Sequence, residues 1–513
     1  MNLDLATYRD KTLGCWTGKN IGGVLGAPFE GKRQRNDVDF YIQDLSMGPP
    51  PNDDLDLQIV WLAAVERYGR QVNASILGEY WLSYIIPNWV EYGTGKANLR
   101  AGLVPPLSGS VHNPYRESNG CFIRSEIWAC LAPGHPDIAV KYAYEDAIVD
   151  HGHEGMYGEI FVAALQSAAF VVSDRDTLID IGLSYIPESC KLAACIAAAR
   201  EYHKEGIPFD EAYTRMHNIA PGTFGVQGSM TTAQAAAAYP GMAVGEAGFD
   251  CPENVGIVIL AWLYGGDDFG ECMILANRCG EDTDCTCGTL GAIWGIIHGA
   301  SGLPEKWTAP LNDAIATMCI DKTGGGIWVP STATELTERI IQVTPGFLGS
   351  RWWSVKDGYT IKTDDLSSLY CRNKDYLSGL NPGGKDLTLT GKELAELPEY
   401  TIRADFPAFT LAAVQTDPFF SRCEPIKLYL RAENDRRMCQ QQWITLRLHL
   451  PAVVEADRTE VTLPLNSLVD AKAEAVFTID PSQFSGSRLE ILCEGALAGR
   501  HSYGVIKVIY FQQ

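Results

Sequence analysis

The spacing of apolar residues changes after about Trp352, and this change limits the folds that the 513-residue chain can adopt. Before it, alanine-rich segments such as 160–172 and 187–206 repeat their apolar residues with a helical period. After it, apolar and polar residues alternate, as in half-buried strands. The alternating segments are 387–390, 426–431, 443–450, 460–463 and 505–511. We therefore predict a multidomain chain: an all-α domain over residues 1–350, then a smaller all-β domain, an antiparallel sandwich, over 351–513.

Acidic side chains outnumber basic ones by 63 to 41, which gives a formal net charge of −22. Proteins that wrap nucleic acid neutralise its phosphates with Lys and Arg. Surfaces that bind anionic lipid also rely on basic clusters. The charge therefore argues against nucleic acid and membrane as partners. It suits a soluble protein whose acidic groups hold cations.

The N-terminal region has no basic segment followed by an apolar core, so we predict no signal peptide. No window approaches about 18 uninterrupted apolar residues, the length needed for a transmembrane helix. The 15 cysteines are scattered instead of lying at the spacings of a disulfide framework. We therefore expect reduced thiols and a cytoplasmic protein. The oligomeric state stays open.

An acidic cluster, Cys279–Gly288, interrupts an apolar region of the helical domain. It contains Glu281, Asp282 and Asp284, and buried carboxylates are costly unless they are paired or bound to a cation. Oxygen ligands of this kind suit Mg²⁺, Mn²⁺ or Ca²⁺. The alternative is a solvated loop whose Asp or Thr caps the next helix. The segment by itself supports both interpretations.

Glycines recur every three or four residues near the N-terminus, in the segment Gly18–Gly31. This spacing is typical of closely packed helices, and the residue order of a nucleotide-binding loop is absent. Pro28 should end the helix, which places Glu30 just beyond it. A glutamate there either faces solvent or takes part in a site.

A second acidic cluster follows three prolines, in the segment Pro49–Asp56. Asn52 or Asp53 can cap the next helix, and the helix dipole favours acidic residues in its first turn. Three aspartates in four positions nevertheless exceed what a cap needs. Asp53 and Asp56 would also share one helix face. This cluster is a second candidate for a site.

Two histidines flanked by glycines, His151 and His153, precede an alanine-rich helix. At the start of a helix they can contact a substrate. Each of them can equally be a structural hydrogen-bonding residue.

Together these segments resemble the ADP-ribosylglycohydrolase superfamily, an all-helical fold that includes the dinitrogenase reductase-activating glycohydrolase. The resemblance is colinear over roughly residues 5–310. The matching pieces are Gly26–Gly31, Asn52–Asp54, Asp146–Ala169, Asp267–Phe269 and Ala276–Asp284.

The resemblance implies a site for one or two divalent ions, Mg²⁺ or Mn²⁺, which orient a sugar diol and activate water. Glu30 would transfer a proton or gate the substrate, and Asp54 would also act in catalysis. The implied metal ligands are Asn52, Asp53, Asp54, Asp282, Asp284 and Cys285. The implied substrate-binding residues are Asp56, Glu126, His151, His153, Tyr157 and Gly158.

Three positions depart from the family pattern. Asn52 and Leu55 stand where threonines often flank the aspartate pair, and Cys285 replaces the usual threonine or serine after the last aspartate. A thiol is a soft ligand that is poorly suited to Mg²⁺. The differences predict a distinct branch of the family.

The function implied by the resemblance is a divalent-metal-dependent hydrolase that cleaves an N- or O-glycosidic bond of ADP-ribosylated or related ribosyl substrates. One alternative is a glycosidase or nucleoside hydrolase that acts on another small sugar substrate with the same site. A second alternative is a non-catalytic protein that binds ADP-ribose or a sugar.

Overall fold

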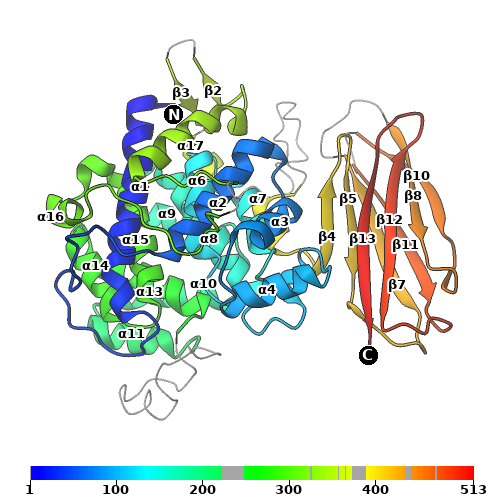
Figure 1. Cartoon of the computed structure of the whole chain (residues 1–513), viewed down its shortest axis with the longest axis horizontal. Coiled ribbons are helices and arrows are strands. Elements are labelled where there is room, and N and C mark those ends of the chain that lie inside the picture. Colours follow the sequence, from blue (N-terminus) through cyan, green and yellow to red (C-terminus); the bar gives the residue numbers. More distant parts are fainter. Residues whose placement is uncertain are drawn as a thin grey trace.

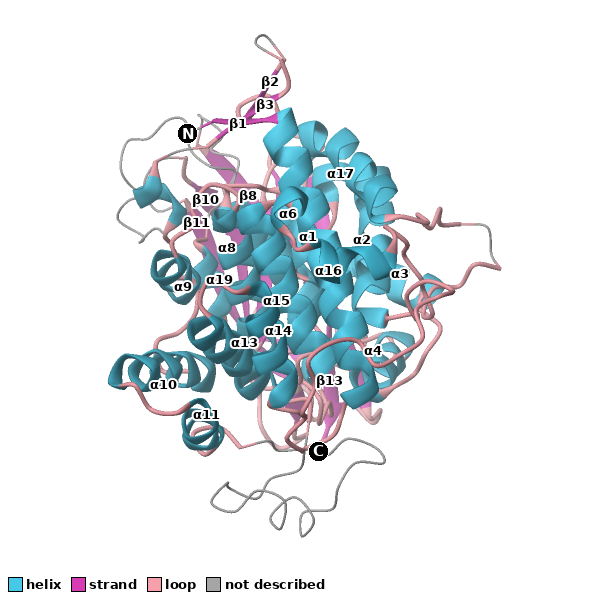
Figure 2. Ribbon diagram, turned by 90° about the vertical axis from the view of Figure 1, so that its left-hand side faces the viewer, coloured by secondary structure: helices cyan, strands magenta, loops and turns pink. Residues whose placement is uncertain are grey.

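The computed structural model describes residues 2–513 except 222–247, 324–325, 356–357, 364, 372–388, 435–440 and 468–470. A large helical part and a smaller β-sandwich lie next to each other (Figure 1). In the perpendicular view the helices lie in front of the strands (Figure 2). The predicted fold class, a helical domain followed by a β domain, is confirmed.

Two helices in direct backbone contact, α1 (Leu5–Gly26) and α15 (Thr283–His298), form the centre of the helical part. A Cβ added at Gly18 would lie 2.0 Å from the carbonyl oxygen of Gly291. A Cβ added at Gly22 would lie 2.1 Å from the backbone of Cys287. Only glycine fits at such contacts, because no protein Cβ approaches backbone atoms so closely. The close helix packing predicted from the glycine spacing is therefore confirmed.

The other helices surround this pair, and the predicted alanine-rich helices are α8 and α10. The helices that lead to the site are α2 (Asp53–Tyr68), α13 (Cys251–Gly265) and α14 (Phe269–Arg278). The remaining ones are α3 (Ala74–Tyr84), α4 (Val90–Arg100), α5 (Leu107–Ser110), α6 (Glu126–Leu131), α7 (Pro136–Ala147), α8 (His153–Ala169), α9 (Arg175–Leu183), α10 (Lys191–Glu205), α11 (Phe209–His217), α16 (Glu305–Thr308), α17 (Ala333–Leu348) and α19 (Gly391–Ala395).

The first strands after α17 belong to the helical part. β2 (Trp353–Ser354) and β3 (Thr360–Lys362) form a small antiparallel sheet with the N-terminal strand β1 (Asn2–Asp4). The side chains of Leu369 and Leu394 lie in the same hydrophobic core as the helices. The core of the helical part therefore continues some 45 residues past the position where the sequence pattern changes, up to α19.

The sandwich contains two five-stranded sheets, ordered β10-β8-β12-β13-β6 and β4-β5-β7-β11-β9. All pairs are antiparallel except that of β13 with β6. The strands are β4 (Tyr400–Asp405), β5 (Thr410–Gln415), β6 (Phe419–Phe420), β7 (Ile426–Glu433), β8 (Gln442–His449), β9 (Glu455–Ala456), β10 (Glu460–Leu465), β11 (Lys472–Asp480), β12 (Arg488–Leu497) and β13 (Tyr503–Gln512).

Four of the five alternating segments are confirmed as strands, namely β7, β8, β10 and β13. Of the fifth, 387–390, residues 387–388 lie outside the described part of the chain, and Thr390 is the N-cap of α19 instead of a strand residue. In β7 and β8 buried side chains alternate with more exposed ones, as expected for sheets that bury one face.

The two parts are joined by apolar and charged contacts. Leu103, Leu107 and Val111, from the helical part, lie in the hydrophobic core of the sandwich. Glu399, just before β4, forms ion pairs with Arg116 at 2.8 Å and with His153 at 3.2 Å. In the part of the chain that the structure describes, no helix combines the length and the hydropathy that a membrane crossing requires.

Candidate active site

Two helices begin at the same place in the molecule, and both begin with acidic residues. α2 has Asp53 and Asp54 in its first turn, and α15 has Asp282 at its N-cap and Asp284 in its first turn. The partial positive charge of a helix N-terminus stabilises carboxylates. The fold thus gathers four carboxylates from two distant segments.

A short backbone bridge brings Glu30 to the same place. The Gly31 N–H donates to the Glu281 carbonyl at 2.8 Å, and the Glu281 N–H donates to the Lys32 carbonyl at 3.1 Å. Gly280 and Glu281 adopt positive φ angles of 74° and 63°, which turn the chain back into α15. Glu281 is strained there, since non-glycine residues rarely adopt this conformation.

Asn52 supports Asp284 through its amide nitrogen. Asn52 Nδ2 donates to Asp284 Oδ2 at 2.9 Å, while Asn52 Oδ1 accepts the Asp54 backbone N–H at 2.9 Å as the helix cap. The oxygen is used by the cap and the nitrogen faces the carboxylates. Metal binding by the Asn52 oxygen therefore stays a prediction.

Cys285 lies beside Asp54. Its Sγ donates a weak hydrogen bond to Asp54 Oδ1 at 3.5 Å. Burial raises the pKa of the Cys285 thiol well above its usual value, which keeps the sulfur protonated. Its Sγ also lies within 4.8 Å of ligand atoms of Asp54 and Asp284, so a role in metal binding stays a prediction.

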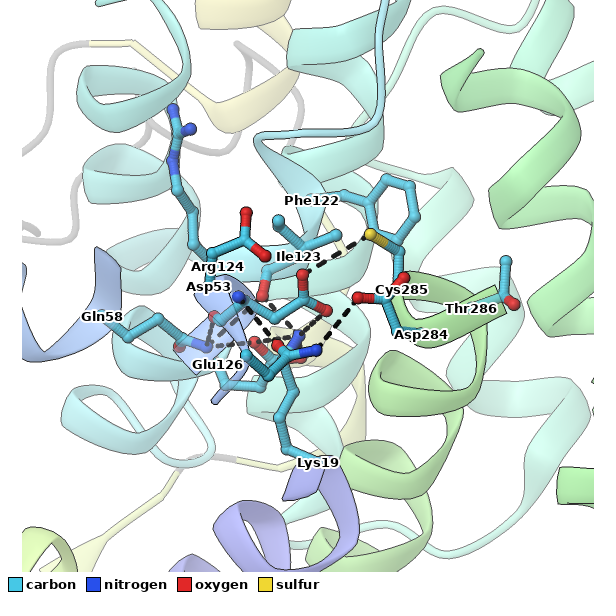
Figure 3. A network of polar contacts seen from close by, with 12 residues as sticks. Lys19, Asp53, Gln58, Phe122, Ile123, Arg124, Glu126, Asp284, Cys285 and Thr286 are labelled. Carbon is cyan, nitrogen blue, oxygen red and sulfur yellow. Dashed lines mark hydrogen bonds and ion pairs between the residues drawn. The ribbon is translucent and has the colours of Figure 1, made fainter. Parts of the chain in front are cut away.

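A buried ammonium group lies beneath the aspartates (Figure 3). Lys19 Nζ is 3.5 Å from Asp54 Oδ2 and 3.4 Å from Glu126 Oε2. Glu126 also accepts hydrogen bonds from Gln58 at 2.9 Å and Gln166 at 3.0 Å. Glu126 thus holds Lys19 in place, and Lys19 supplies a fixed positive charge to Asp54.

Asp282 is fixed by a loop that precedes α6. Asn119 Nδ2 donates to Asp282 Oδ2 at 2.8 Å. The loop itself is held by Arg124, which donates to the Gly120 carbonyl at 2.9 Å and forms a 2.6 Å ion pair with Asp150. This buried network positions Asn119 and, through it, Asp282.

The carboxylates raise one another's pKa values. Burial and the charge of Asp284 raise the pKa of Asp53 to about 6. The charge of Asp284, followed by burial, raises the pKa of Glu30 to about 9. Burial is the largest cause of the raised pKa values of Asp54 and Asp282. The cluster holds more negative charge than the protein alone neutralises.

Several oxygens in this cluster have no hydrogen-bond partner among the described residues. They are Asp282 Oδ1, Asp284 Oδ1 and Asp54 Oδ2, all buried, and of these Asp54 Oδ2 is ion-paired with Lys19 at 3.5 Å. Buried polar atoms normally find a partner. Glu30, Asp282 and Asp284 lie close enough for one oxygen of each to touch the same ion. The residues therefore fit a hard divalent cation, which prefers carboxylate oxygen.

The cluster opens into a cavity of about 270 Å³. Its walls come from the site carboxylates, from the first turn of α4 with the residues just before it, and from the loop before α6. The lining residues include Glu30, Asp53, Asp54, Trp89, Val90, Glu91, Tyr92, Asn119, Asp282 and Asp284.

A model of the ADP-ribosylglycohydrolase family matches residues 4–344, which include every carboxylate of this cluster. The chain belongs to this family. It is accordingly a hydrolase that acts on glycosidic bonds.

Among solved structures, the chain is similar to one described as an "ADP-ribosylglycohydrolase-related protein complex". The two are 18% identical, and the match covers 67% of this chain and 98% of the other, with a TM-score of 0.38. No curated protein matches the sequence.

Three of the predicted substrate-binding residues lie around a second, smaller pocket of this glycohydrolase. His151, His153 and Tyr157 line a pocket of about 50 Å³ together with Glu399. His151 is buried and its Nε2 is 2.8 Å from Ser118 Oγ. His153 is paired with Glu399. The structure thus places them apart from the cavity of the carboxylates, and substrate binding by them stays a prediction.

The other three predicted substrate-binding residues also lie outside the cavity lining. Asp56 Oδ2 accepts the backbone N–H of Met318 at 2.7 Å and that of Cys319 at 2.5 Å. Glu126 pairs with Lys19, and Gly158 packs against Cys251. These positions have structural partners that the spacing of residues in the sequence does not reveal.

A second group of possible metal ligands, His217, Glu253 and Glu281, already contacts other side chains. Arg33 pairs with Glu281 at 2.5 Å and with Glu253 at 3.7 Å. Tyr213 donates to Glu253 at 3.2 Å. We therefore assign this group to the packing beneath the loop of Glu281.

Four residues of the family site are not evident from the sequence: Lys19, Tyr92, Asn119 and Glu91. Tyr92 donates its hydroxyl to Asp53 Oδ2 at 3.0 Å. Each comes from a helix or loop whose sequence resembles that of any buried segment. Of these four residues, only Lys19 could have been identified from the sequence. It lies in a glycine-rich apolar helix, and a buried lysine needs carboxylate partners.

Proposed function

We propose that the chain is a divalent-metal-dependent hydrolase that cleaves an N- or O-glycosidic bond of ADP-ribosylated or related ribosyl substrates. The family supports hydrolysis of ADP-ribosyl bonds. The observation that carries the metal dependence is the set of buried carboxylate oxygens without hydrogen-bond partners at the base of the cavity. The proposed cofactor is Mg²⁺ or Mn²⁺, as one or two ions.

Asp54, Asp284, Asp282 and Glu30 supply the oxygens that would hold the cations. When bound, such ions would polarise the sugar hydroxyls and lower the pKa of bound water. Lys19 holds Asp54, Asn52 holds Asp284, and Asn119 holds Asp282, so each ligand is oriented by a neighbour. Supporting contacts of this kind fix ligand geometry.

Glu30 is the proposed proton-transfer residue. It lines the cavity beside Asp282 and Asp284, from which its carboxyl group can reach a bound substrate. A donor at that place can protonate the leaving group while positive charge develops on the sugar. Asp54 would contribute as a catalytic carboxylate by holding the cation.

A release assay tests the proposal in Mg²⁺ and in EDTA. It measures free ADP-ribose from ADP-ribosyl-arginine and ADP-ribosyl-serine, and free ribose from a nucleoside panel. We expect turnover in Mg²⁺ and its loss in EDTA and in Asp282→Ala. Glu30→Gln should lower kcat by about 10²–10⁴-fold, the range for loss of a general acid or base. Turnover that survives EDTA or Asp282→Ala would refute the metal role, and normal kcat in Glu30→Gln would refute the assignment of Glu30.

A second candidate, a hydrolase of smaller ribosides, is favoured by one observation. None of the cavity-lining residues that the structure describes is basic, so no described side chain there neutralises a diphosphate. Preferential turnover of the nucleoside panel would identify this function. Tight ADP-ribose binding without any turnover would identify a non-catalytic binder.

We also propose that the enzyme works in the cytoplasm. The buried cysteines that the structure describes, Cys121 and Cys130 among them, are thiols and not disulfides. Reduced thiols are typical of cytosolic proteins.

A further inference from the structure

Lys19 is a buried lysine on the central helix α1, and the proposed chemistry uses it only to hold Asp54. The residue is 2% exposed. Its Nζ donates to the carbonyl oxygen of Ile123 and lies 3.4 Å from Glu126 Oε2 and 3.5 Å from Asp54 Oδ2 (Figure 3). Opposite charges this close favour the charged form of each group, so the lysine is an ammonium.

The ammonium is held firmly in its place. Glu126 accepts hydrogen bonds from Gln58 at 2.9 Å and from Gln166 at 3.0 Å, which fix the carboxylate beside Lys19. Helix α15 closes the other side, since a Cβ added at Gly288 would lie 3.5 Å from the Lys19 carbonyl oxygen and 3.6 Å from its Cδ. The charge of Lys19 is therefore a permanent part of the site.

The carboxylate cluster contains two possible positions for an ion, and they share Asp284. One position is formed by Asp54, Asp284 and Cys285. The other is formed by Glu30, Asp282 and Asp284. A protein that bound two ions here would fill both positions.

The first position already contains a positive charge. Asp54 Oδ2 faces the Lys19 ammonium at 3.5 Å, and Asp54 Oδ1 accepts a weak hydrogen bond from the Cys285 thiol at 3.5 Å. An ion there would have sulfur as one ligand, which suits Mg²⁺ and Mn²⁺ poorly. It would also be repelled by an ammonium that the packing does not allow to move away. This position therefore disfavours a hard divalent ion.

The second position has the opposite character. Asp282 Oδ1 and Asp284 Oδ1 are buried and have no hydrogen-bond partner among the described residues. Glu30 lines the cavity beside them, and none of the described lining residues is basic. Buried acceptors are normally satisfied, so oxygens without a partner point to a bound cation.

We propose that Lys19 takes the place of a second metal ion, so that the site binds a single divalent ion through Glu30, Asp282 and Asp284. This inference rests on the proposed metal-dependent function, whose number of ions it fixes. Asp54 would hold the ammonium with Oδ2, and Oδ1 is the oxygen that it can still offer to the ion. Lys19 is not among the residues that line the cavity, so it acts through Asp54 as a positioning residue.

Titration of the full-length protein with Mn²⁺ counts the ions. After EDTA treatment and dialysis, calorimetry should give one Mn²⁺ per chain for the unaltered protein. Lys19→Met, which removes the charge and keeps a long side chain, should give two. Lys11→Met is the matched control, because Lys11 is also on α1 and its Nζ donates to the carbonyl oxygens of Ile296 and Ile297 instead of contacting the carboxylates. It should leave the count at one.

Electron paramagnetic resonance separates a second ion in the cluster from an ion on the surface. Two Mn²⁺ ions about 3.5–4 Å apart, as in two-metal sites, couple magnetically and lose the sharp hyperfine pattern of an isolated ion. We expect the coupled signal in Lys19→Met and the isolated signal in the unaltered protein and in Lys11→Met. If Lys19 only held Asp54 in place, Lys19→Met would instead bind a single, uncoupled ion more weakly.

The double variant Lys19→Met/Glu126→Gln serves if Lys19→Met does not fold, because it removes a buried negative charge together with the ammonium. It should also bind two coupled ions. Two ions in the unaltered protein, or a single ion in both Lys19 variants, overturns the inference. One bound ion without turnover of any substrate would refute the proposed hydrolase function alone. Two bound ions with turnover that EDTA abolishes would refute the inference alone.

Discussion

The contact between α1 and α15 yields the sharpest prediction for stability. In Gly18→Ala the new Cβ would lie 2.0 Å from the Gly291 oxygen and 2.5 Å from its carbonyl carbon, both backbone atoms. Overpacking of this kind costs about 1–3 kcal/mol. Replacing glycine by alanine within a helix recovers about 0.5–1 kcal/mol. Because neither backbone can rotate away as a side chain can, we expect a net loss of about 2 kcal/mol.

Gly346→Ala is the control, because Gly346 lies in α17 and an added Cβ meets nothing within 4 Å. It should raise the free energy of unfolding by up to about 1 kcal/mol. Urea unfolding followed by circular dichroism gives both values from the midpoints at unchanged slope. Since Lys19 adjoins Gly18, Mg²⁺ affinity should also fall in Gly18→Ala. If Gly18→Ala is as stable as Gly346→Ala, the two backbones are not in the contact described.

Three further outcomes are expected. Mg²⁺ at about 100 times its Kd should stabilise the protein by about 2.7 kcal/mol in thermal unfolding, and Asp284→Asn should lose most of this gain; an undiminished shift would exclude Asp284 as a ligand. Burial raises the pKa of Glu91 to about 7, so the folded state binds a proton more tightly than the unfolded state, and stability should fall as pH rises from about 5 to 8 in EDTA. This decline in stability should be shallower in Glu91→Gln. An equal slope in both proteins would show that Glu91 does not cause the decline. Lys19→Met should lower the free energy of unfolding by about 3–5 kcal/mol, because it leaves Asp54 and Glu126 without their cation. In urea unfolding, the double variant Lys19→Met/Glu126→Gln should recover part of this loss.

The sequence predicts those parts of the site that depend on local chemistry. Asp54 and Asp284 lie in first helical turns, where capping and the helix dipole leave a recognisable pattern. Glycine spacing likewise predicts the close approach of α1, because only small residues allow it.

Contacts between distant segments leave no such pattern. Asp56 looks like another member of the acidic cluster, yet its side chain turns to the backbone of Met318, far along the chain. His153 resembles a site residue and is instead paired with Glu399, next to the sandwich. Asn119 and Tyr92 contact the site through an amide and a hydroxyl group, and the residues around them in the sequence mark neither one as part of a site.

The N-terminal strand and the residues that follow α17 determine where the chain can be cut between the helices and the sandwich. β1 is held by β3, and Leu369 and Leu394 fill the helical core although they follow the end of the region matched by the family model at residue 344. A fragment cut at that point would expose apolar core and leave β1 without its neighbour. The smallest fragment that retains a closed helical core therefore extends to α19. The described residues that lead into the sandwich, Leu389, Leu394 and Ala395, lie in that interior, so the sandwich is not a detachable module.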